Sequence, residues 1–258
     1  MTKIGVVGLG LIGGSIFRDL KEFGYDVVGV SASQAGTLPD VFADYSVLKG
    51  SDLVFVCKEM SKTLAVLDEL SEYLDKTTVV SDVCSLKGFV ASKEFNYNFI
   101  PTHPMAGTEF SGWKSSKTGL FKGAKWVITS DKKSELLEEL ITKMGAEIVY
   151  TTPELHDEAV ALISHAPMVL AQALYKSVSD NDLAKKLASS GFRDMTRLAL
   201  SSIDMAEDMV TMNHKNIEKS LLKLYSSIGE LTHGNYREQI SQIKEEREKM
   251  YNNGVNVI

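Results

Sequence analysis

A glycine-rich turn near the N-terminus constrains the fold of this chain more than any other stretch. Residues 3–8 are rich in β-branched side chains, and the sequence Gly-Leu-Gly-Leu-Ile-Gly follows at residues 8–13. Residues 11–23 then have the apolar spacing of an amphipathic helix that ends at Gly24. A second strand is expected over residues 26–30. This order of strand, glycine turn, helix and strand is the context in which a Gly-x-Gly-x-x-Gly string binds a dinucleotide.

Each glycine of the turn has its own expected role. Gly8 permits the tight turn, Gly10 lets backbone amides approach a pyrophosphate, and Gly13 lets the helix pack closely on the strand. The first helical turn, with Leu11 and Ile12, would present its partial positive charge to the phosphates. We therefore predict a cofactor site here, and the alternative is a purely structural turn.

The end of the second strand bears on the choice of cofactor. It carries Ser31-Ala32-Ser33-Gln34 instead of the acidic residue that usually binds the ribose of NAD. The hydroxyls of Ser31 and Ser33 suit a 2′-phosphate, but the arginine that commonly clamps this phosphate is missing. NAD and NADP both stay open, with a slight preference for NADP. Cys57, at the end of a further expected strand, is predicted to border the same site.

Strands and helices continue to alternate through the first half of the chain. Further strands are expected at residues 53–57, 78–83, 98–100, 125–129 and 147–150, and helices at residues 60–74 and 134–144. Residues 35–50 are too few for a full helix and strand, so we expect one or two helical turns around residues 39–45. The alternation predicts an α/β fold with a doubly wound, mostly parallel sheet.

The second half of the chain has no strand pattern. Helices are expected at residues 154–177, 180–188, 193–200, 203–233 and 236–251. We therefore predict two domains, a dinucleotide-binding domain over residues 1–151 and an all-helical domain over residues 152–258. The apolar face of the long helices, which includes Ile217, Leu221 and Ile228, exceeds what a small domain covers. We expect a homodimer through these helices, and the alternative is a monomer with this face packed on the sheet domain.

His103 is the first candidate for catalysis. It lies between Pro101 and Pro104, just after an expected strand, and the prolines predict a stiff, extended loop. Ligands bind at the carboxyl ends of parallel strands, and an imidazole exchanges protons near neutral pH. The alternative is a histidine that caps a turn and has no chemical role.

The helical half offers further candidates for substrate binding. His156 and His165 point to opposite sides of one expected straight helix, and His165 lies where a following proline can kink it. For both histidines, a buried or capping role is the alternative. Arg193 and Arg197 are spaced as neighbours on one helix face and suit a carboxylate ligand. The alternative is an exposed ion pair between Arg193 and Asp194.

Composition narrows the class of protein. The chain has 28 Lys and Arg against 34 Asp and Glu, a net charge of −6, so a nucleic-acid or anionic membrane surface is disfavoured. Its 2 cysteines form no Cys-x-x-Cys pair, and the N-terminus begins with a strand instead of a signal segment. No apolar run approaches the ~20 residues of a membrane helix. We expect a cytoplasmic enzyme, without a metal site.

Six motifs in order give the chain a specific resemblance. They are GLGLIGGS at 8–15, SDVCSLK at 81–87, HPMAG at 103–107, ELHD at 154–157, SHAP at 164–167 and GFRDMTR at 191–197. Together they resemble the prephenate and arogenate dehydrogenases of tyrosine biosynthesis. The resemblance implies a Rossmann domain followed by a helical dimerisation domain. It also implies NAD- or NADP-dependent oxidative decarboxylation of prephenate to 4-hydroxyphenylpyruvate, or alternatively of arogenate to tyrosine.

The resemblance also implies roles for single residues. His103 corresponds to the histidine that accepts the proton of the substrate 4-hydroxyl as hydride leaves C4, and Ser85 to the serine that positions this hydroxyl. Arg197 corresponds to the arginine that holds a substrate carboxylate, with Arg193 as a helper. His165 is expected to contact the substrate.

The chain departs from the family pattern in two places. Ala166 and Met168 stand where relatives often have a leucine and a second histidine, which leaves the choice between prephenate and arogenate open. Residues 58–60, Lys-Glu-Met, stand where relatives often have a Thr-Pro pair near the cofactor. We expect no room for the regulatory or mutase domains of some relatives. Two alternatives are a β-hydroxy acid dehydrogenase, for which no matching catalytic lysine motif is present, and a non-catalytic NAD(P) sensor.

Overall fold

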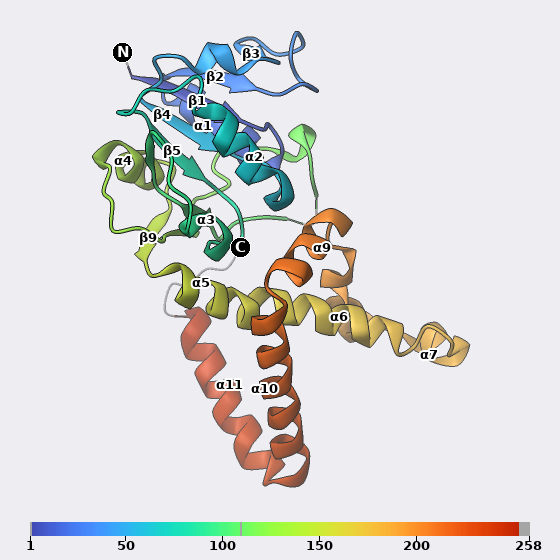
Figure 1. The fold of residues 1–258 in the computed structure, drawn as a ribbon. Helices are drawn as coiled ribbons and strands as arrows, with labels where there is room; N and C mark the ends of the chain where they lie inside the picture. The colour runs from blue at the N-terminus through green and yellow to red at the C-terminus, as the bar shows by residue number, and fades with distance from the viewer. Residues whose placement is uncertain (1, 109, 253–258) are drawn as a thin grey trace. The chain divides into compact units, whose positions relative to one another are not determined.

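A computed structural model describes residues 2–108 and 110–252 of the chain (Figure 1). The contacts divide it into two compact units, Met1–His156 and Asp157–Ile258. This division lies a few residues after the domain boundary that we predicted between residues 151 and 152. The predicted boundary stays a prediction. None of the described helices is long and apolar enough to cross a membrane.

A six-stranded parallel sheet forms the centre of the first unit (Figure 1). Its order is β3-β2-β1-β4-β5-β6, and every neighbouring pair is parallel. The strands are β1 Lys3–Val7, β2 Asp26–Val30, β3 Val41–Phe42, β4 Leu53–Val56, β5 Val79–Asp82 and β6 Asn98–Phe99. The prediction of a doubly wound parallel sheet is confirmed. Because the strand order reverses between β1 and β4, the carboxyl ends of these two strands border the crevice where such sheets bind ligands.

Three short or medium helices connect these strands. Helix α1, Leu11–Glu22, follows β1, helix α2, Met60–Leu70, follows β4, and the short helix α3, Gly88–Ala91, follows β5. Apolar side chains of α1 and α2 are buried against opposite clusters of the core, as two-sided burial of a parallel sheet requires.

The prediction of helical turns around residues 39–45 is wrong. Asp40 has a left-handed backbone with a φ of 58°, and its carboxylate pairs with Lys21 at 2.7 Å. The following strand β3 then pairs with β2, since the Ser31 amide donates to the Phe42 carbonyl at 2.8 Å. A 3₁₀ turn, Tyr45–Leu48, comes only afterwards. Pairing at the edge of the sheet therefore outweighed the local preference of this short segment.

A second, three-stranded sheet carries the predicted His103 segment. Its order is β7-β8-β9, formed by Thr102–Pro104, Lys125–Ile128 and Glu147–Tyr150. Strand β7 is antiparallel to β8, and His103 is paired with Val127. A 3₁₀ turn, Trp113–Ser115, lies between β7 and β8, and helix α4, Glu135–Lys143, lies between β8 and β9.

Two expectations for this region are therefore corrected. The segment around His103 is a strand instead of a loop, because the extended backbone that prolines favour also suits strand pairing. The strands after residue 124 form a separate sheet instead of extending the parallel one, because they pair with β7.

The second unit is helical throughout its described residues. It contains the end of α5 and eight further elements (Figure 1). They are α5 Pro153–Val160, the π-helical turn η3 Ala161–His165, α6 Ala166–Lys176, α7 Asp182–Leu187, α8 Ser190–Met195, the 3₁₀ turn η4 Arg197–Leu200, α9 Ile203–Met212, α10 His214–His233 and α11 Tyr236–Asn252. The prediction of helices after residue 153 is confirmed, but two of the predicted helices, 193–200 and 203–233, are each broken in two.

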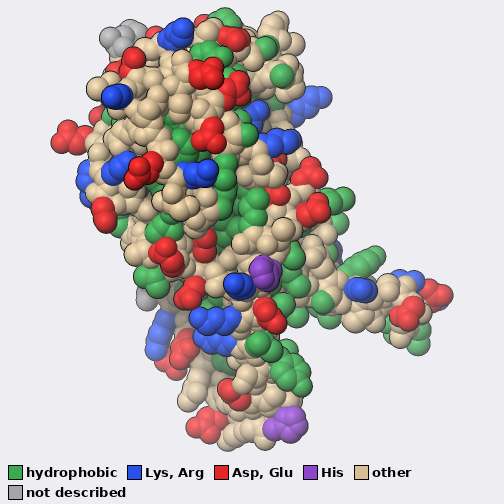
Figure 2. Space-filling view, viewed as in Figure 1, with side chains coloured by type: hydrophobic (Ala, Val, Ile, Leu, Met, Phe, Trp, Pro, Cys, Tyr) green, Lys and Arg blue, Asp and Glu red, His purple; other side chains and the backbone are tan. Residues whose placement is uncertain are grey.

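Many large apolar side chains of this unit are exposed. Figure 2 shows such side chains along its helices. They include Leu183, Leu187, Leu200, Ile203, Leu222 and Tyr225, each with well over half of its surface exposed. A surface of this kind is unusual for an isolated soluble unit.

Asn213 explains the break between α9 and α10. Its side-chain amide donates to the Asp157 carbonyl at 2.9 Å and lies 3.3 Å from Nδ1 of His165. Its Oδ1 accepts a hydrogen bond from Asn216 at 2.8 Å. The residue is buried. A buried amide with three partners fixes the start of α10 against the first turn of the unit.

We predict that Asn213→Ala lowers the free energy of unfolding by about 1–3 kcal/mol, because buried partners lose their hydrogen bonds. Urea unfolding followed by circular dichroism measures the loss. The exposed neighbour His214 supplies the control variant His214→Ala, for which we expect less than about 0.5 kcal/mol. Equal losses in the two variants would contradict this interpretation.

Candidate functional site

The glycine turn between β1 and α1 is packed tightly at two points and open at a third. Gly8 has a φ of 89°, and a Cβ atom built on it would lie 2.2 Å from the Cys57 carbonyl oxygen. A Cβ atom built on Gly13 would lie 1.9 Å from the Gly8 carbonyl oxygen, so the first turn of α1 packs directly on the glycine turn. A Cβ atom on Gly10 would meet nothing within 4 Å. The turn is therefore closed toward the sheet and open at Gly10.

The N-terminus of α1 fits an anionic group. Gly10 is its N-cap and provides no side chain to accept a hydrogen bond, and the first turn contains no acidic residue. The amides of this turn, which includes Leu11 and Ile12, therefore keep their capacity to donate to a ligand. The pyrophosphate of a dinucleotide has the charge and size that such a turn binds, so these residues fit the predicted cofactor.

The other predicted cofactor residues lie at the carboxyl ends of β2 and β4, the two strands that flank β1. Ser31 follows β2, and its Oγ lies 3.3 Å from Oγ of Ser33. Cys57 follows β4, and its amide donates to the Val7 carbonyl at 2.7 Å. Burial raises the pKa of the Cys57 thiol well above its ordinary value and that of Cys84 to about 12. Both thiols are therefore neutral at pH 7 and unsuited to nucleophilic chemistry.

A buried ion pair holds the turn after β5 to strand β7. Lys87 is fully buried, pairs with the Asp82 carboxylate, and donates a second hydrogen bond to the Thr102 carbonyl at 2.6 Å. The Thr102 hydroxyl donates to the Asp82 carbonyl at 2.8 Å. The Cys84 amide donates to the Asp82 carboxylate at 3.0 Å. These bonds fix the turn that carries Ser85 to the strand that carries His103.

Ser85 and His103 are both partly exposed at the ends of this network. The Ser85 hydroxyl points to the Met60 sulfur at 3.3 Å, which is a weak acceptor. His103 lies one residue after Thr102, whose carbonyl Lys87 holds. Each side chain is thus supported by buried polar contacts of its neighbours and can still reach a ligand.

His103 is hydrogen-bonded to a second histidine. Its Nδ1 lies 2.9 Å from Nε2 of His156, with the two rings edge to face at 78°. His156 is 3% exposed and lies in the first turns of α5. If Nδ1 of His103 is the donor, Nε2 is its unprotonated nitrogen and can accept a proton from a ligand; the tautomers are inferred from this geometry.

His156 was weighed only as a candidate for substrate binding or a buried histidine, and its contact with His103 was not predicted, although it belongs to the quoted ELHD motif. Helical spacing compared it with His165 on one expected straight helix, and such spacing says nothing about strand β7. The signal that could have found it is the acidic, polar motif at the start of a helix, directly after the last strand. Lys87 was missed for the same reason, since it closes the SDVCSLK motif.

The predicted substrate residues of the second unit are arranged differently from our expectation. His165 is buried at the end of the π-helical turn, before Pro167, and its Nδ1 lies 3.3 Å from the Asn213 amide. Arg193 is exposed and pairs with Asp194 at 3.2 Å, which is the alternative that we considered. Arg197 begins the next short helix and is exposed.

The expectation that both arginines share one helix face is wrong. Helix α8 ends at Met195, and the Thr196 hydroxyl turns back to the Phe192 carbonyl at 2.7 Å, so Arg197 starts a separate 3₁₀ turn. The substrate roles of His165, Arg193 and Arg197 stay predictions.

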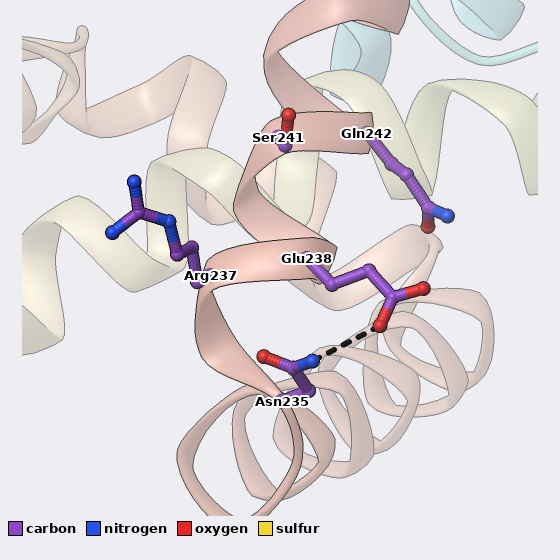
Figure 3. A pocket seen from close by; sticks show the side chains of 5 residues that line it. All are labelled: Asn235, Arg237, Glu238, Ser241 and Gln242. Carbon is purple, nitrogen blue, oxygen red and sulfur yellow. Dashed lines mark hydrogen bonds between the residues drawn. The ribbon is translucent and has the colours of Figure 1, made fainter.

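Two surface hollows of the helical unit lie apart from these residues. One, of about 380 Å³, lies at the start of α11, where the Asn235 amide donates to the Glu238 carboxylate at 3.0 Å (Figure 3). The other, of about 350 Å³, is mostly apolar and is lined by α6, α9 and α10. No predicted site residue lines either hollow. Within the described residues, no group of three or more His, Cys, Asp or Glu side chains could hold a metal ion.

Comparison with known proteins decides the family. Residues 19–150 match the family profile described as "Prephenate dehydrogenase, nucleotide-binding domain", and residues 152–247 match the one described as "Prephenate dehydrogenase, dimerization domain". The chain belongs to the prephenate dehydrogenase family. The resemblance stated from the six motifs is thereby confirmed.

Relatives agree with this membership over most of the chain. The prephenate dehydrogenase of Bacillus subtilis is 32% identical over 238 residues, which cover 82% of this chain and 64% of that relative. This chain therefore spans less than two thirds of that curated relative. The structure of Synechocystis arogenate dehydrogenase is 31% identical and covers 96% of this chain and 100% of its own, with a TM-score of 0.81.

A third relative was solved with ligands. The prephenate dehydrogenase of A. aeolicus in complex with hydroxyphenyl propionate and NAD+ is 25% identical, covers 100% of this chain and 99% of its own, and has a TM-score of 0.80. The prephenate dehydrogenase family thus includes proteins with the fold of both units described above.

The contrast between Gly13 and Gly10 gives a prediction for the cofactor turn. We expect Gly13→Ala to lower the free energy of unfolding by about 2–3 kcal/mol, because a backbone oxygen cannot move aside. Gly10→Ala should cost less than about 1 kcal/mol but should weaken nucleotide binding. Urea unfolding and nucleotide titration of both variants measure this. A stable Gly13→Ala variant would show that the turn is not packed as described.

The buried ion pair gives a second prediction. Lys87→Met leaves the Asp82 carboxylate buried without its cation, and we expect the free energy of unfolding to fall by about 3–5 kcal/mol. Lys125 pairs with Glu147 at an exposed site and provides the matched control Lys125→Met, with an expected loss below about 1 kcal/mol. Thermal and urea unfolding compare the two. Similar losses would mean that the buried pair does not hold β7.

Proposed function

We propose that this chain is an NAD(P)-dependent dehydrogenase that converts prephenate to 4-hydroxyphenylpyruvate by oxidative decarboxylation, in tyrosine biosynthesis. The single observation that carries the proposal is the hydrogen bond between Nδ1 of His103 and Nε2 of His156, on a strand fixed beside the Ser85 turn. Its sequence context matches the family motifs, and the named relatives act on, or are named for, prephenate or arogenate. Conversion of arogenate to tyrosine is the alternative.

His103 acts as the base in this proposal. A bound nicotinamide cofactor would supply the hydride acceptor for C4 of the substrate. Nε2 of His103 takes the proton of the 4-hydroxyl at the same carbon, so that this carbon becomes a carbonyl. His156 holds the Nδ1 side of the ring, which keeps Nε2 directed to the ligand and stabilises the imidazolium that forms. Ser85 orients the same hydroxyl by a hydrogen bond.

Loss of carbon dioxide needs no further group of the protein. The electron pair of the ring carbon–carboxylate bond moves into the ring, the new carbonyl oxygen recovers a proton, and the ring becomes aromatic. The gain of aromaticity drives the step. The protein therefore has to orient the substrate and exchange one proton.

Arg197 is our proposed ligand for a substrate carboxylate. It makes no ion pair with any carboxylate among the described residues, whereas Arg193 is already paired with Asp194. A guanidinium that keeps its donors can hold a carboxylate through two hydrogen bonds. Arg193 is its proposed helper, and His165 is a further proposed substrate contact.

We propose prephenate as the substrate in preference to arogenate. The two compounds differ in one group. Prephenate carries a keto group on its side chain, and arogenate carries an amine. Ala166 and Met168 are both buried, so this stretch offers packing and no polar ligand for either group. The choice is left to the kinetic test.

We propose further that the enzyme is a cytoplasmic homodimer through its helical unit. The matched family description names a dimerization domain, and the exposed apolar side chains of α7, α9 and α10 offer a surface for a second copy. Both cysteines are free thiols, as in a reducing compartment. We propose no nucleic-acid or membrane partner.

The proposal predicts turnover that depends on His103. Wild-type protein should reduce NAD or NADP with prephenate or arogenate, and His103→Asn should lower kcat at least ~100-fold because the proton acceptor is lost. The nucleotide dissociation constant should not change. His233→Asn alters an exposed histidine and serves as the control with full activity. No turnover in any of the four wild-type pairings would refute the proposed function.

A further inference from the structure

Lys58 lies over the glycine turn and has no part in the site described so far. Strand β4 ends at Val56, and Cys57 and Lys58 follow it. A Cβ atom built on Gly8 would lie 3.3 Å from Cδ of Lys58. The aliphatic part of the lysine thus lies against the first glycine of the turn, at the carboxyl ends of β1 and β4. The side chain is partly buried.

The backbone of Lys58 is fixed by neighbouring side chains. Its carbonyl accepts a hydrogen bond from Oγ1 of Thr63 at 3.4 Å, and the thiol of Cys84 donates to it at 3.6 Å. Thr63 and Cys84 are both buried. The backbone from which the Lys58 side chain extends is therefore held in place, unlike that of a lysine on an exposed helix face.

The ammonium group of Lys58 has no ion-pair partner among the residues that the structure describes. The adjacent acid, Glu59, pairs with Lys62 at 3.5 Å instead. A backbone hydrogen bond is the main cause that lowers the pKa of the Glu59 carboxyl, and the charges of Lys62 and Lys58 contribute less. The first turn of α1 contains no acidic residue either. A cation is thus held beside an uncapped helix N-terminus, and both attract an anion.

We propose that the ammonium group of Lys58 binds a phosphate group of the dinucleotide, together with the first-turn amides of α1. The inference rests on the proposed function, since it assumes a dinucleotide at this turn. It gives a physical meaning to the departure at residues 58–60, where a lysine replaces the pattern common in relatives. It also supplies the cation that the stretch Ser31–Gln34 lacks.

The pyrophosphate and the 2′-phosphate are both anionic groups that an ammonium group binds. A comparison of NAD with NADP distinguishes between them. The pyrophosphate is present in NAD and NADP, whereas the 2′-phosphate is present in NADP alone. Isothermal titration of NAD, NADP and adenosine against the full chain measures the dissociation constants without catalysis. The variants are Lys58→Gln, which removes the charge, and Lys58→Arg, which keeps it.

Lys76→Gln is the matched control, because Lys76 is exposed and lies before β5, at the amino-terminal edge of the sheet. We expect Lys58→Gln to raise the dissociation constant of the nucleotide about tenfold, the usual scale for one charge-assisted hydrogen bond. Lys58→Arg should restore most of the affinity, and adenosine binding should be unchanged. The effect should shrink at high salt. Thermal unfolding without nucleotide checks that each variant is folded.

The outcomes separate this inference from the proposed function. A loss with both nucleotides assigns Lys58 to the pyrophosphate, and a loss with NADP alone assigns it to the 2′-phosphate; either supports the inference. Wild-type binding together with unchanged affinity of folded Lys58→Gln overturns the inference and leaves the proposed function standing. Failure of the wild type to bind NAD or NADP overturns both.

Discussion

The buried ion pair between Lys87 and Asp82 is the interaction on which the site depends. Charges without water must be paired, so the lysine and the carboxylate have almost no freedom to separate. Lys87 also holds the Thr102 carbonyl, and Asp82 also accepts from the Cys84 amide. One pair therefore connects the turn after β5 of the parallel sheet to the first strand of the second sheet. Ser85 and His103 receive their positions from opposite ends of this connection.

Local sequence was sufficient where the structure is determined by local sterics. The three glycines of the turn were assigned separate roles in packing, and the structure places Gly8 and Gly13 against backbone atoms and Gly10 in open space. The parallel strands follow from apolar runs that are buried on both faces. Pairing between segments that are distant in the sequence could not be predicted from local sequence. The extended backbone around Pro101 and Pro104 suits a loop and a strand equally, and only β8 decides between them.

Only part of the candidate site could be predicted, because some of its contacts join segments that are distant in the sequence. His103 was found because its own neighbours are unusual. His156 was a candidate too, but its contact with His103, across 53 positions of the chain, could not be predicted from its neighbours. The arginine pair shows the opposite error. Spacing on one helix was assumed, but Thr196 bonds back to the preceding turn and ends it. Local spacing holds only while the helix continues, and single-sequence reasoning places such breaks poorly.

The central claim is that His156 holds the ring of His103 so that Nε2 remains a proton acceptor. Nitrogen-15 NMR of histidine-labelled protein reports directly which ring nitrogen carries the proton. For neutral His103, we predict a proton on its Nδ1 and none on its Nε2, and a mixture of both tautomers in His156→Phe. A proton on Nε2 of His103 in the wild type would contradict the account, because the nitrogen that should face the substrate would then be a donor.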